Sequence, residues 1–252
     1  MQAVEYTRLA EAEDRLWYLR ALRKRVVQTC MAAELLSGAV VLDAGCGTGG
    51  LLRALAQWRG DLSLHGVDLS PIACEYARKG GTFEVREGSI EELPCADNQF
   101  DAIITVDVLT QVESSLLALV ECFRCLKPGG LLVVNSAAMP SLWSYHDERV
   151  QSIRRLRGGE LRNLVREAGL EVRFLTHWNF LLLPLAILRR KVFPRRDGAS
   201  DVAPPFAPLN AALGAVAALE RLAMRAGVRF PLGTSLFVIA RKSKRHPRVH
   251  ER

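Results

Sequence analysis

Apolar residues along the chain follow two spacings, one typical of strands and one typical of helices. Residues 40–42 form a short apolar run that predicts a buried strand, and after a set of glycines apolar residues recur at helical spacing over 49–56. Residues 62–68 alternate and predict a second strand. The apolar runs 100–106 and 131–138 predict two more strands.

The two ends of the chain also carry regular patterns. Residues 7–36 have leucines and valines at helical spacing and predict one or two helices. Residues 158–178 predict a helix and then a strand, and residues 233–243 predict the last strand. Between these two strands lies an apolar stretch followed by basic residues, and then a predicted helix with a wide apolar stripe at positions 209, 213, 216, 219, 222 and 226.

The composition fits one large domain, or one domain with an added subdomain, because 49% of the 252 residues are hydrophobic. The mixed-charge N-terminus predicts no signal peptide. Pro184 and the shortness of the apolar runs predict no transmembrane helix. Six cysteines are scattered along the chain, which favours a reduced, cytoplasmic protein. Cys122 and Cys125 form a lone CxxC pair on a predicted helix, so we expect neither a redox centre nor a metal site there.

The net charge of +7 is distributed unevenly. Residues 1–148 contain 13 Lys/Arg and 20 Asp/Glu, a net charge of −7, whereas residues 149–252 contain 21 and 7, a net charge of +14. Such a division is typical of a chain that meets a polyanion, either nucleic acid or anionic lipid. A solvated basic face with a basic tail explains it equally well, and both interpretations stay open.

The glycines after the first predicted strand indicate a nucleotide-binding turn, because glycines let the backbone approach a ligand beside free N–H groups. Gly45, Gly47 and Gly50 satisfy GxGxxG, while Gly45, Gly47 and Gly49 satisfy GxGxG, so the glycines alone do not identify the ligand. Asp43 precedes them. A carboxylate there repels a pyrophosphate and attracts an ammonium or sulfonium group. S-adenosylmethionine carries both groups and has no phosphate.

The second predicted strand ends at Asp68, which lies 25 residues after Asp43. An acidic residue at this place accepts hydrogen bonds from ribose hydroxyls. Asp68 stands just before Ser70 and Pro71, so a capping role explains it when it is taken alone. The two aspartates at this spacing favour nucleoside binding.

The chain resembles the class I S-adenosylmethionine-dependent methyltransferases over about residues 35–138. "VLDAGCGTGG" resembles their first motif and "GVDLS" their second. "REGSIEELPCADNQFDAIITVDVL" resembles the third and fourth motifs, and "LKPGGLLVV" the fifth. The resemblance implies a Rossmann-like α/β fold with a seven-stranded, mostly parallel sheet and one antiparallel strand, and it implies S-adenosylmethionine as cofactor.

The resemblance also implies roles for individual residues. Asp43 is expected to face the methionine amino group through a water, Asp68 to hold the ribose hydroxyls, and Asp107 to line the methyl-donor pocket. Ser89 stands where many relatives have Asp, which removes a charge beside the adenine. The implied cofactor contacts are Tyr18, Arg20, Asp43, Gly45, Cys46, Gly47, Gly49, Asp68, Leu69, Ser89, Ile90 and Asp107.

The segment after the strand at 100–106 departs from the family pattern. Many relatives have Glu-His where this chain has Thr110 and Gln111, and glutamine does not accept a proton at neutral pH. Either another residue is the general base or the reaction needs none, because alignment and desolvation supply much of the acceleration of methyl transfer. A hydroxyl acceptor usually needs a base, whereas a neutral amine or a carbon nucleophile needs little help.

The segment "SLWSYHDERVQSIRRL" (141–156) contains the candidate replacement, His146. It follows the strand at 131–138, so in this fold it lies at the carboxyl edge of the sheet. It resembles a subgroup of bacterial type 11 methyltransferases, although Ser152 and Leu156 replace that subgroup's second histidine and its tyrosine. His146 is interpreted as a substrate contact, a base or a loop residue. The candidates are His146 and Gln111 for catalysis, and Trp143, Tyr145, Arg154 and Arg155 for substrate binding.

The predicted function is methyl transfer to a small, hydrophobic acceptor, either a lipid or a natural-product intermediate. The alternatives are a nucleic-acid methyltransferase, which the basic half favours, and a non-catalytic binding scaffold. The insert is interpreted as a lid, as a homodimer contact, or as a peripheral membrane contact through 178–226 at the inner membrane face. The predicted divisions are an N-terminal helical cap (1–36), the cofactor-binding core (37–177), the helical insert (178–232), the last core strand (233–243) and a basic disordered tail (244–252).

Overall fold

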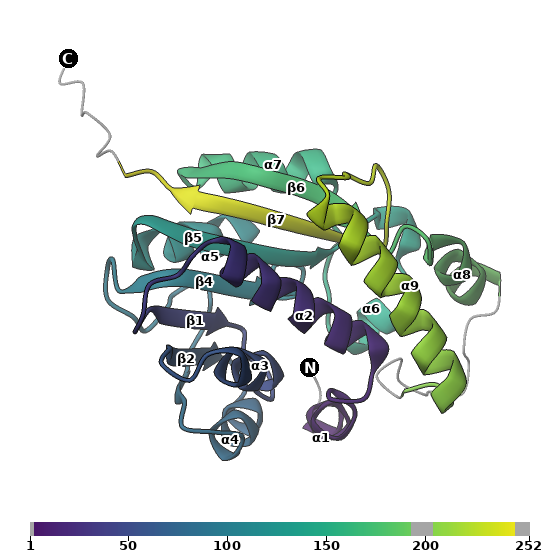
Figure 1. The fold of residues 1–252 in the computed structure, drawn as a ribbon, viewed down its shortest axis with the longest axis horizontal. Helices are drawn as coiled ribbons and strands as arrows, with labels where there is room; N and C mark the ends of the chain where they lie inside the picture. Colours follow the sequence, from purple (N-terminus) through teal and green to yellow (C-terminus); the bar gives the residue numbers. More distant parts are fainter. Residues whose placement is uncertain (1–2, 193–203, 245–252) are drawn as a thin grey trace.

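Seven strands form a single sheet in the computed structural model, which describes residues 3–192 and 204–244. Figure 1 shows the arrangement of these strands and the helices around them. The order of the strands is β3-β2-β1-β4-β5-β7-β6. β7 runs antiparallel to both β5 and β6, and the other neighbouring strands are parallel. The predicted seven-stranded, mostly parallel sheet with one antiparallel strand is confirmed.

Strands and helices alternate along most of the described chain. The strands are β1 (Val40–Ala44), β2 (Ser63–Asp68), β3 (Glu84–Glu87), β4 (Phe100–Val106), β5 (Leu126–Ala137), β6 (Leu170–Trp178) and β7 (Ser235–Lys242). The helices are α1 (Ala3–Ala12), α2 (Trp17–Ala32), α3 (Gly50–Trp58), α4 (Pro71–Lys79), α5 (Ser115–Cys125), the short η1 (Pro140–Leu142), α6 (Tyr145–Arg149), α7 (Gly158–Glu167), α8 (Leu183–Ile187), η2 (Leu188–Val192) and α9 (Ala207–Arg225).

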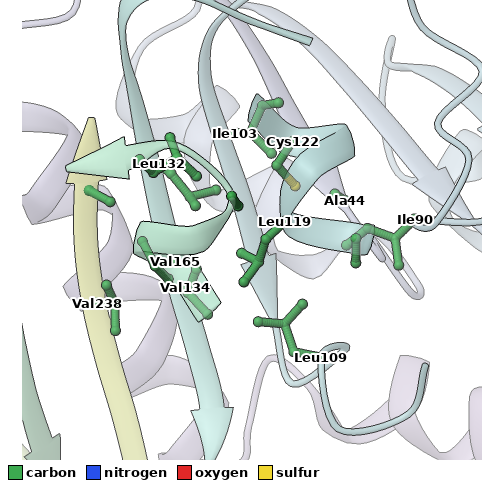
Figure 2. Close-up of a cluster of buried hydrophobic side chains, with 14 of the residues drawn as sticks. Ala44, Ile90, Ile103, Leu109, Leu119, Cys122, Leu132, Val134, Val165 and Val238 are labelled. Atoms are coloured by element: carbon green, nitrogen blue, oxygen red, sulfur yellow. The ribbon is translucent and has the colours of Figure 1, made fainter. Parts of the chain in front are cut away.

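Both faces of the sheet are covered, so the central strands are buried on two sides. In β5, Leu132 and Val134 point to the face covered by α5 and α7, while Leu131 and Val133 point to the face covered by α2, α3, α4 and α9. Figure 2 shows part of the first core, where Leu119 of α5 lies over strand side chains. This double burial explains why the central strands read as nearly continuous apolar runs.

The CxxC pair belongs to this first core. Cys122 is completely buried and appears among the core side chains in Figure 2, and Cys125 is buried with it. Both thiols are free. Within the described residues no group of three or more His, Cys, Asp or Glu side chains is arranged to hold a metal ion. The two cysteines therefore pack as small apolar residues.

The insert between β6 and β7 contains α8, η2 and α9. The predicted apolar stripe of α9 is only partly turned inward, because Leu219 and Leu222 are 62% and 63% exposed while Ala217 and Glu220 are buried. The orientation of α9 about its own axis is set by the Glu220 carboxylate, because it accepts hydrogen bonds from the backbone N–H groups of residues 179–181. Three donors at the end of β6 thus decide which face of α9 turns inward.

Two basic stretches noted in the sequence, 194–196 in the insert and 245–252 in the tail, lie outside the described residues. Among the helices that the structure does describe, none has the length and apolarity needed to span a bilayer.

Replacing Glu220 by alanine should destabilise the protein by about 2–3 kcal/mol, because it leaves three backbone N–H groups without their acceptor. Urea unfolding followed by circular dichroism measures the change. Leu219→Ala, one residue earlier on the exposed face, is the matched control and should change the free energy of unfolding by less than about 0.5 kcal/mol. Equal effects of the two substitutions would contradict this account of how α9 is held.

Candidate active site

A cavity of about 590 Å³ lies at the carboxyl ends of β1, β2 and β4. The strand order reverses between β1 and β4, and open α/β sheets bind their ligands at such a switch point. Residues of α1, α2, α6, α8, η2 and α9 close the cavity from the other sides. The cavity therefore joins the end of the sheet to both the N-terminal helices and the insert.

Asp43 lies near the end of β1 and lines the cavity there. The side chain is 2% exposed, and its Oδ1 is buried without a hydrogen-bond partner. Burial, reinforced by the nearby carboxylates Asp68 and Glu13, raises the pKa of Asp43 from 3.8 to about 8. A buried carboxyl group in this situation is stabilised by a cation, so it fits the amino group of S-adenosylmethionine.

The turn after β1 requires glycine at its first position. Gly45 has φ +87, and a Cβ there would overlap Cγ2 of Val108. Gly49 has φ +82, but a Cβ there would lie 2.9 Å from Cα of Ala77, so this glycine serves packing against α4. Gly50, the first residue of α3, lines the cavity instead. Gly49 itself does not line the cavity, and the cofactor contact implied for it stays a prediction.

Asp68 connects three parts of the site through its carboxylate. Oδ2 accepts a hydrogen bond from the Gly47 N–H at 2.9 Å, and Oδ1 accepts one from the Ser70 N–H at 2.9 Å. The Tyr6 hydroxyl also hydrogen-bonds Asp68, and burial raises the pKa of Tyr6 to about 12, so this hydroxyl stays protonated at neutral pH. Asp68 therefore holds the glycine turn, the end of β2 and α1 together.

The segment 13–23 supplies charged residues that the sequence patterns did not reveal. Glu13 is 5% exposed, lines the cavity and forms an ion pair with Arg53 of α3. Arg23 also lines the cavity, and its Nη1 donates to the Gly50 carbonyl at 3.2 Å. Its Nη2 is buried without a hydrogen-bond partner. Arg23 Nη1 already pairs with Asp14 Oδ1 at 2.7 Å, so its buried Nη2 is the nitrogen placed to meet a carboxylate. Arg20, predicted as a cofactor contact, is exposed and outside the cavity lining.

A buried polar network fixes the far wall of the cavity around Asp107. The Asp107 carboxylate accepts hydrogen bonds from Asn135 Nδ2 at 2.8 Å and from the Tyr18 hydroxyl at 3.2 Å. Asn135 in turn accepts one from the Trp178 indole at 2.8 Å, and the Tyr18 ring stacks on that indole. Burial raises the pKa values of both Asp107 and Tyr18. Asp107 has φ +59, an uncommon conformation that marks many functional positions.

The segment 141–156 is held by a buried ion pair. Asp147 caps α6 by accepting hydrogen bonds from the backbone N–H and the hydroxyl of Ser144, and it receives Arg155 Nε at 2.8 Å. Arg155 also donates to the Ala138 carbonyl at 2.8 Å. These contacts order the loop so that His146, on the first turn of α6, lines the cavity. Gln111 lines it too.

The predicted residues divide into two groups. Those that line the cavity are Tyr18, Asp43, Gly45, Cys46, Gly47, Asp68, Asp107, Gln111, His146 and Arg155. Those that do not line it are Arg20, Gly49, Leu69, Ser89, Ile90, Trp143, Tyr145 and Arg154.

The residues outside the cavity have other surroundings. Ile90 is buried in the core of Figure 2, and Leu69 is exposed. Ser89 accepts a hydrogen bond from the N–H of Glu91. Arg154 donates to the Glu113 carbonyl at 2.7 Å. The adenine contacts implied for Ser89 and Ile90 stay predictions.

Comparison with known proteins matches the part of the chain that contains Asp43, the glycine turn and Asp68. Residues 42–134 match the family described as methyltransferase domain. A demethylmenaquinone methyltransferase of Tropheryma whipplei is 34% identical over 145 residues, which cover 54% of this chain and 58% of that protein. A probable S-adenosylmethionine-dependent methyltransferase of Mycolicibacterium smegmatis is 27% identical over 168 residues, which cover 64% and 62%. The match thus spans about three fifths of the length of these curated relatives.

Solved structures share the fold. A putative sarcosine dimethylglycine methyltransferase from Galdieria sulphuraria superposes with a TM-score of 0.61 at 22% identity, over 90% of this chain and 86% of that one. A putative methyltransferase of Haloferax volcanii, solved in complex with its Trm112 activator, superposes with a TM-score of 0.64 at 20% identity, over 96% of both chains. At these identities the comparison supports the architecture of the sheet and its helices.

Gly45→Ala should weaken the binding of S-adenosylmethionine by at least ~10-fold, because the added methyl group forces Val108 or the turn to move. Calorimetric titration measures the affinity. Gly38→Ala is the control: Gly38 also has positive φ, +71, but no atom lies within 4 Å of its Cβ position. That control should lose only ~1 kcal/mol of stability and keep its affinity. Comparable binding by both variants would contradict the assignment of the turn.

Asp43→Asn should make the ligand-free protein more stable than wild type as the pH rises. The folded-state pKa of Asp43 is raised from 3.8 to about 8, so its contribution is fully present below pH 3.8 and is lost as the pH rises towards 8. The melting temperatures of the two proteins should therefore diverge from pH 5 to pH 8, while the variant binds S-adenosylmethionine more weakly. A difference in melting temperature that does not change with pH would contradict the buried, unpaired carboxyl group.

Proposed function

We propose that this chain, a class I S-adenosylmethionine-dependent methyltransferase by its domain and fold, methylates a small, hydrophobic acceptor. The observation that carries the proposal is the contrast between the two parts of the cavity. One part holds Glu13, Asp43 and Asp68, which suit a cationic cofactor. The part formed by the insert is mostly apolar, although Arg189 and Arg190 also line it; its apolar side chains come from Leu182, Leu185, Ala186, Pro204, Pro205, Leu209 and Leu213.

The residues present fit the cofactor at both ends of its amino-acid moiety. Asp43 offers a buried oxygen without a partner for the ammonium group, and Arg23 offers a buried nitrogen without a partner for the carboxylate. When bound, the cofactor supplies an electrophilic methyl group on a sulfonium. The chain contributes alignment of the two reactants and exclusion of water, which are large effects for a displacement of this kind.

His146 is our candidate for the residue that receives a proton from a hydroxyl acceptor. It lines the same cavity as Gln111, which stands where many relatives have a histidine. The hydrogen bonds of Asp147 with Ser144 and Arg155 hold the segment that carries His146 in place. Arg155 already balances Asp147, so it acts on substrate as a hydrogen-bond donor at the wall rather than as a free cation.

The names of the relatives support a hydrophobic acceptor. Besides the demethylmenaquinone methyltransferases, similar proteins include a ubiquinone biosynthesis O-methyltransferase of Cereibacter sphaeroides, which is 34% identical over 104 residues. By contrast, a malonyl-[acyl-carrier protein] O-methyltransferase of Pectobacterium atrosepticum, 33% identical over 163 residues, has by its name an acceptor carried on a protein. We therefore place a quinone-type phenol first among the acceptors to test.

The insert also supports peripheral contact with a membrane, from which an apolar acceptor enters. Leu181, Leu185, Ile187 and Leu188 are exposed around α8, and Leu219 is exposed on α9. An apolar surface beside basic residues is typical of interfacial helices. A homodimer contact through the same surface is the alternative, and sedimentation with anionic vesicles distinguishes it from membrane binding.

The direct test supplies methyl-labelled S-adenosylmethionine and the purified protein to an extract of its own cells. We expect the label in the organic-soluble fraction, and a demethylated quinone added alone should also accept it. Label in nucleic acid would support the alternative that the basic half binds a polyanion, and label in protein would likewise contradict the proposal. Binding of the cofactor without any transfer would support the binding scaffold.

His146→Ala should lower kcat by ~100-fold or more with a hydroxyl acceptor, because proton transfer by a positioned side chain contributes about this much. The affinity for S-adenosylmethionine should stay within a factor of two of wild type. His65→Ala, on β2 and outside the cavity lining, is the control and should leave kcat unchanged. A His146→Ala enzyme with full kcat and an unchanged pH profile would remove His146 from the reaction.

A further inference from the structure

A second cavity, of about 680 Å³, lies between α2 and α9 over β5, β6 and β7. Figure 1 shows these two helices on the same side of the sheet. The cavity shares no lining residue with the candidate active site. It is lined by Arg25, Gln28, Thr29, Met31, Ala32, Ala33, Leu131, Arg173, Phe174, Arg221, Met224, Arg225, Phe237, Ile239 and Arg241.

Five arginines line this cavity, and no aspartate or glutamate does. Two of the five have partners: Arg173 pairs with Glu171, and Arg241 donates to the Gly129 carbonyl at 2.9 Å. Arg221 is half-buried, and burial together with the nearby Arg225 lowers its pKa. The lining thus concentrates positive charge where like charges repel each other, and an anion would relieve this repulsion.

Arg25 is the most deeply buried of the five. It is 4% exposed, and both Nε and Nη1 are buried without a hydrogen-bond partner. Its guanidinium lies 4.4 Å from the ring centre of Trp178 and 5.4 Å from that of Phe237. Burial lowers the pKa of Arg25 to about 10, and the nearby buried carboxylate of Glu220 opposes this shift without forming an ion pair with Arg25 in the part of the chain that the structure describes. Ring contacts hold the guanidinium in place but do not satisfy its N–H groups.

The wall formed by the sheet and α9 is apolar. Leu131 of β5, Phe237 and Ile239 of β7, and Met224 of α9 contribute side chains to it. The cavity therefore combines an apolar wall with arginines, of which Arg25, Arg221 and Arg225 form no ion pair within the described residues. A small inorganic anion would satisfy the arginines alone and leave the apolar wall without a partner.

We propose that the cavity between α2 and α9 binds an anionic amphiphile, meaning an acidic headgroup carried on an apolar chain. Arg25 and Arg221 contact the headgroup, and the chain lies along Leu131, Phe237 and Met224. The site is separate from the methyl-transfer cavity and is independent of the proposed acceptor.

The test titrates n-octyl phosphate, below its critical micelle concentration, into the full-length protein and into two variants. Arg25→Met and Arg221→Gln should each weaken binding by ~10-fold or more, because each removes a charge-assisted contact to the headgroup. Arg166→Gln, an exposed arginine of α7 on the opposite face of the sheet, is the matched control and should bind like wild type.

Two further probes separate the charge from the chain. Inorganic phosphate and octyl glucoside should each bind at least ~10-fold more weakly than n-octyl phosphate. Inorganic phosphate lacks the apolar chain, and octyl glucoside lacks the negative charge. S-adenosylhomocysteine should bind both variants like wild type, whatever the fate of the methyl-transfer proposal.

Several outcomes would overturn the proposal. One is the absence of saturable octyl phosphate binding, and another is binding that neither variant weakens. Equal affinity for inorganic phosphate would replace the amphiphile by a free anion, and equal affinity for octyl glucoside would remove the role of the arginines. If Arg25→Met does not fold, Arg221→Gln against Arg166→Gln decides the question.

Discussion

The buried carboxyl group of Asp43 is the constraint on which the site depends. It lies at the end of a central strand, almost inaccessible to solvent, and its Oδ1 has no hydrogen-bond partner. Asp68 and Glu13 add negative charge around it rather than relieving it. Burying such a group costs folding free energy unless a cation is bound, so the site is built at the expense of stability. Binding of a cofactor with a cationic amino group raises the free energy of unfolding, because the carboxyl group then has a counter-ion.

The N-terminal helices are part of the site because polar contacts connect them to the strand ends. Tyr6 of α1 reaches Asp68, and Tyr18 of α2 reaches Asp107. The insert is attached in a similar way, through Glu220 and the backbone at the end of β6. Each contact joins an element outside the core to the carboxyl edge of the sheet. The cavity is therefore enclosed by segments that are far apart in the sequence but are all attached to the carboxyl edge of the sheet.

The sequence was most informative where one strand, one turn and one helix follow each other directly. The spacing of Asp43, Gly45 and Asp68 depends on local geometry, and all three line the cavity. Glu13 and Arg23 could not be found in this way, because they reach the site only through the packing of the N-terminal segments against α3. The sequence predicted a wide apolar stripe on α9 but not which face of the helix turns inward, because the Glu220 hydrogen bonds decide this. Long-range polar contacts leave no periodic signal in a sequence.

The most direct test of the central claim compares two ligands that differ in one group. S-adenosylhomocysteine has the amino group that Asp43 is expected to bind, and its deaminated analogue has hydrogen in that place. Calorimetric titration at pH 8 should give an affinity for the deaminated analogue that is at least ~10-fold weaker, with the difference abolished in Asp43→Asn. Equal affinities of the wild-type protein for the two ligands would show that the buried carboxyl group does not recognise the cofactor.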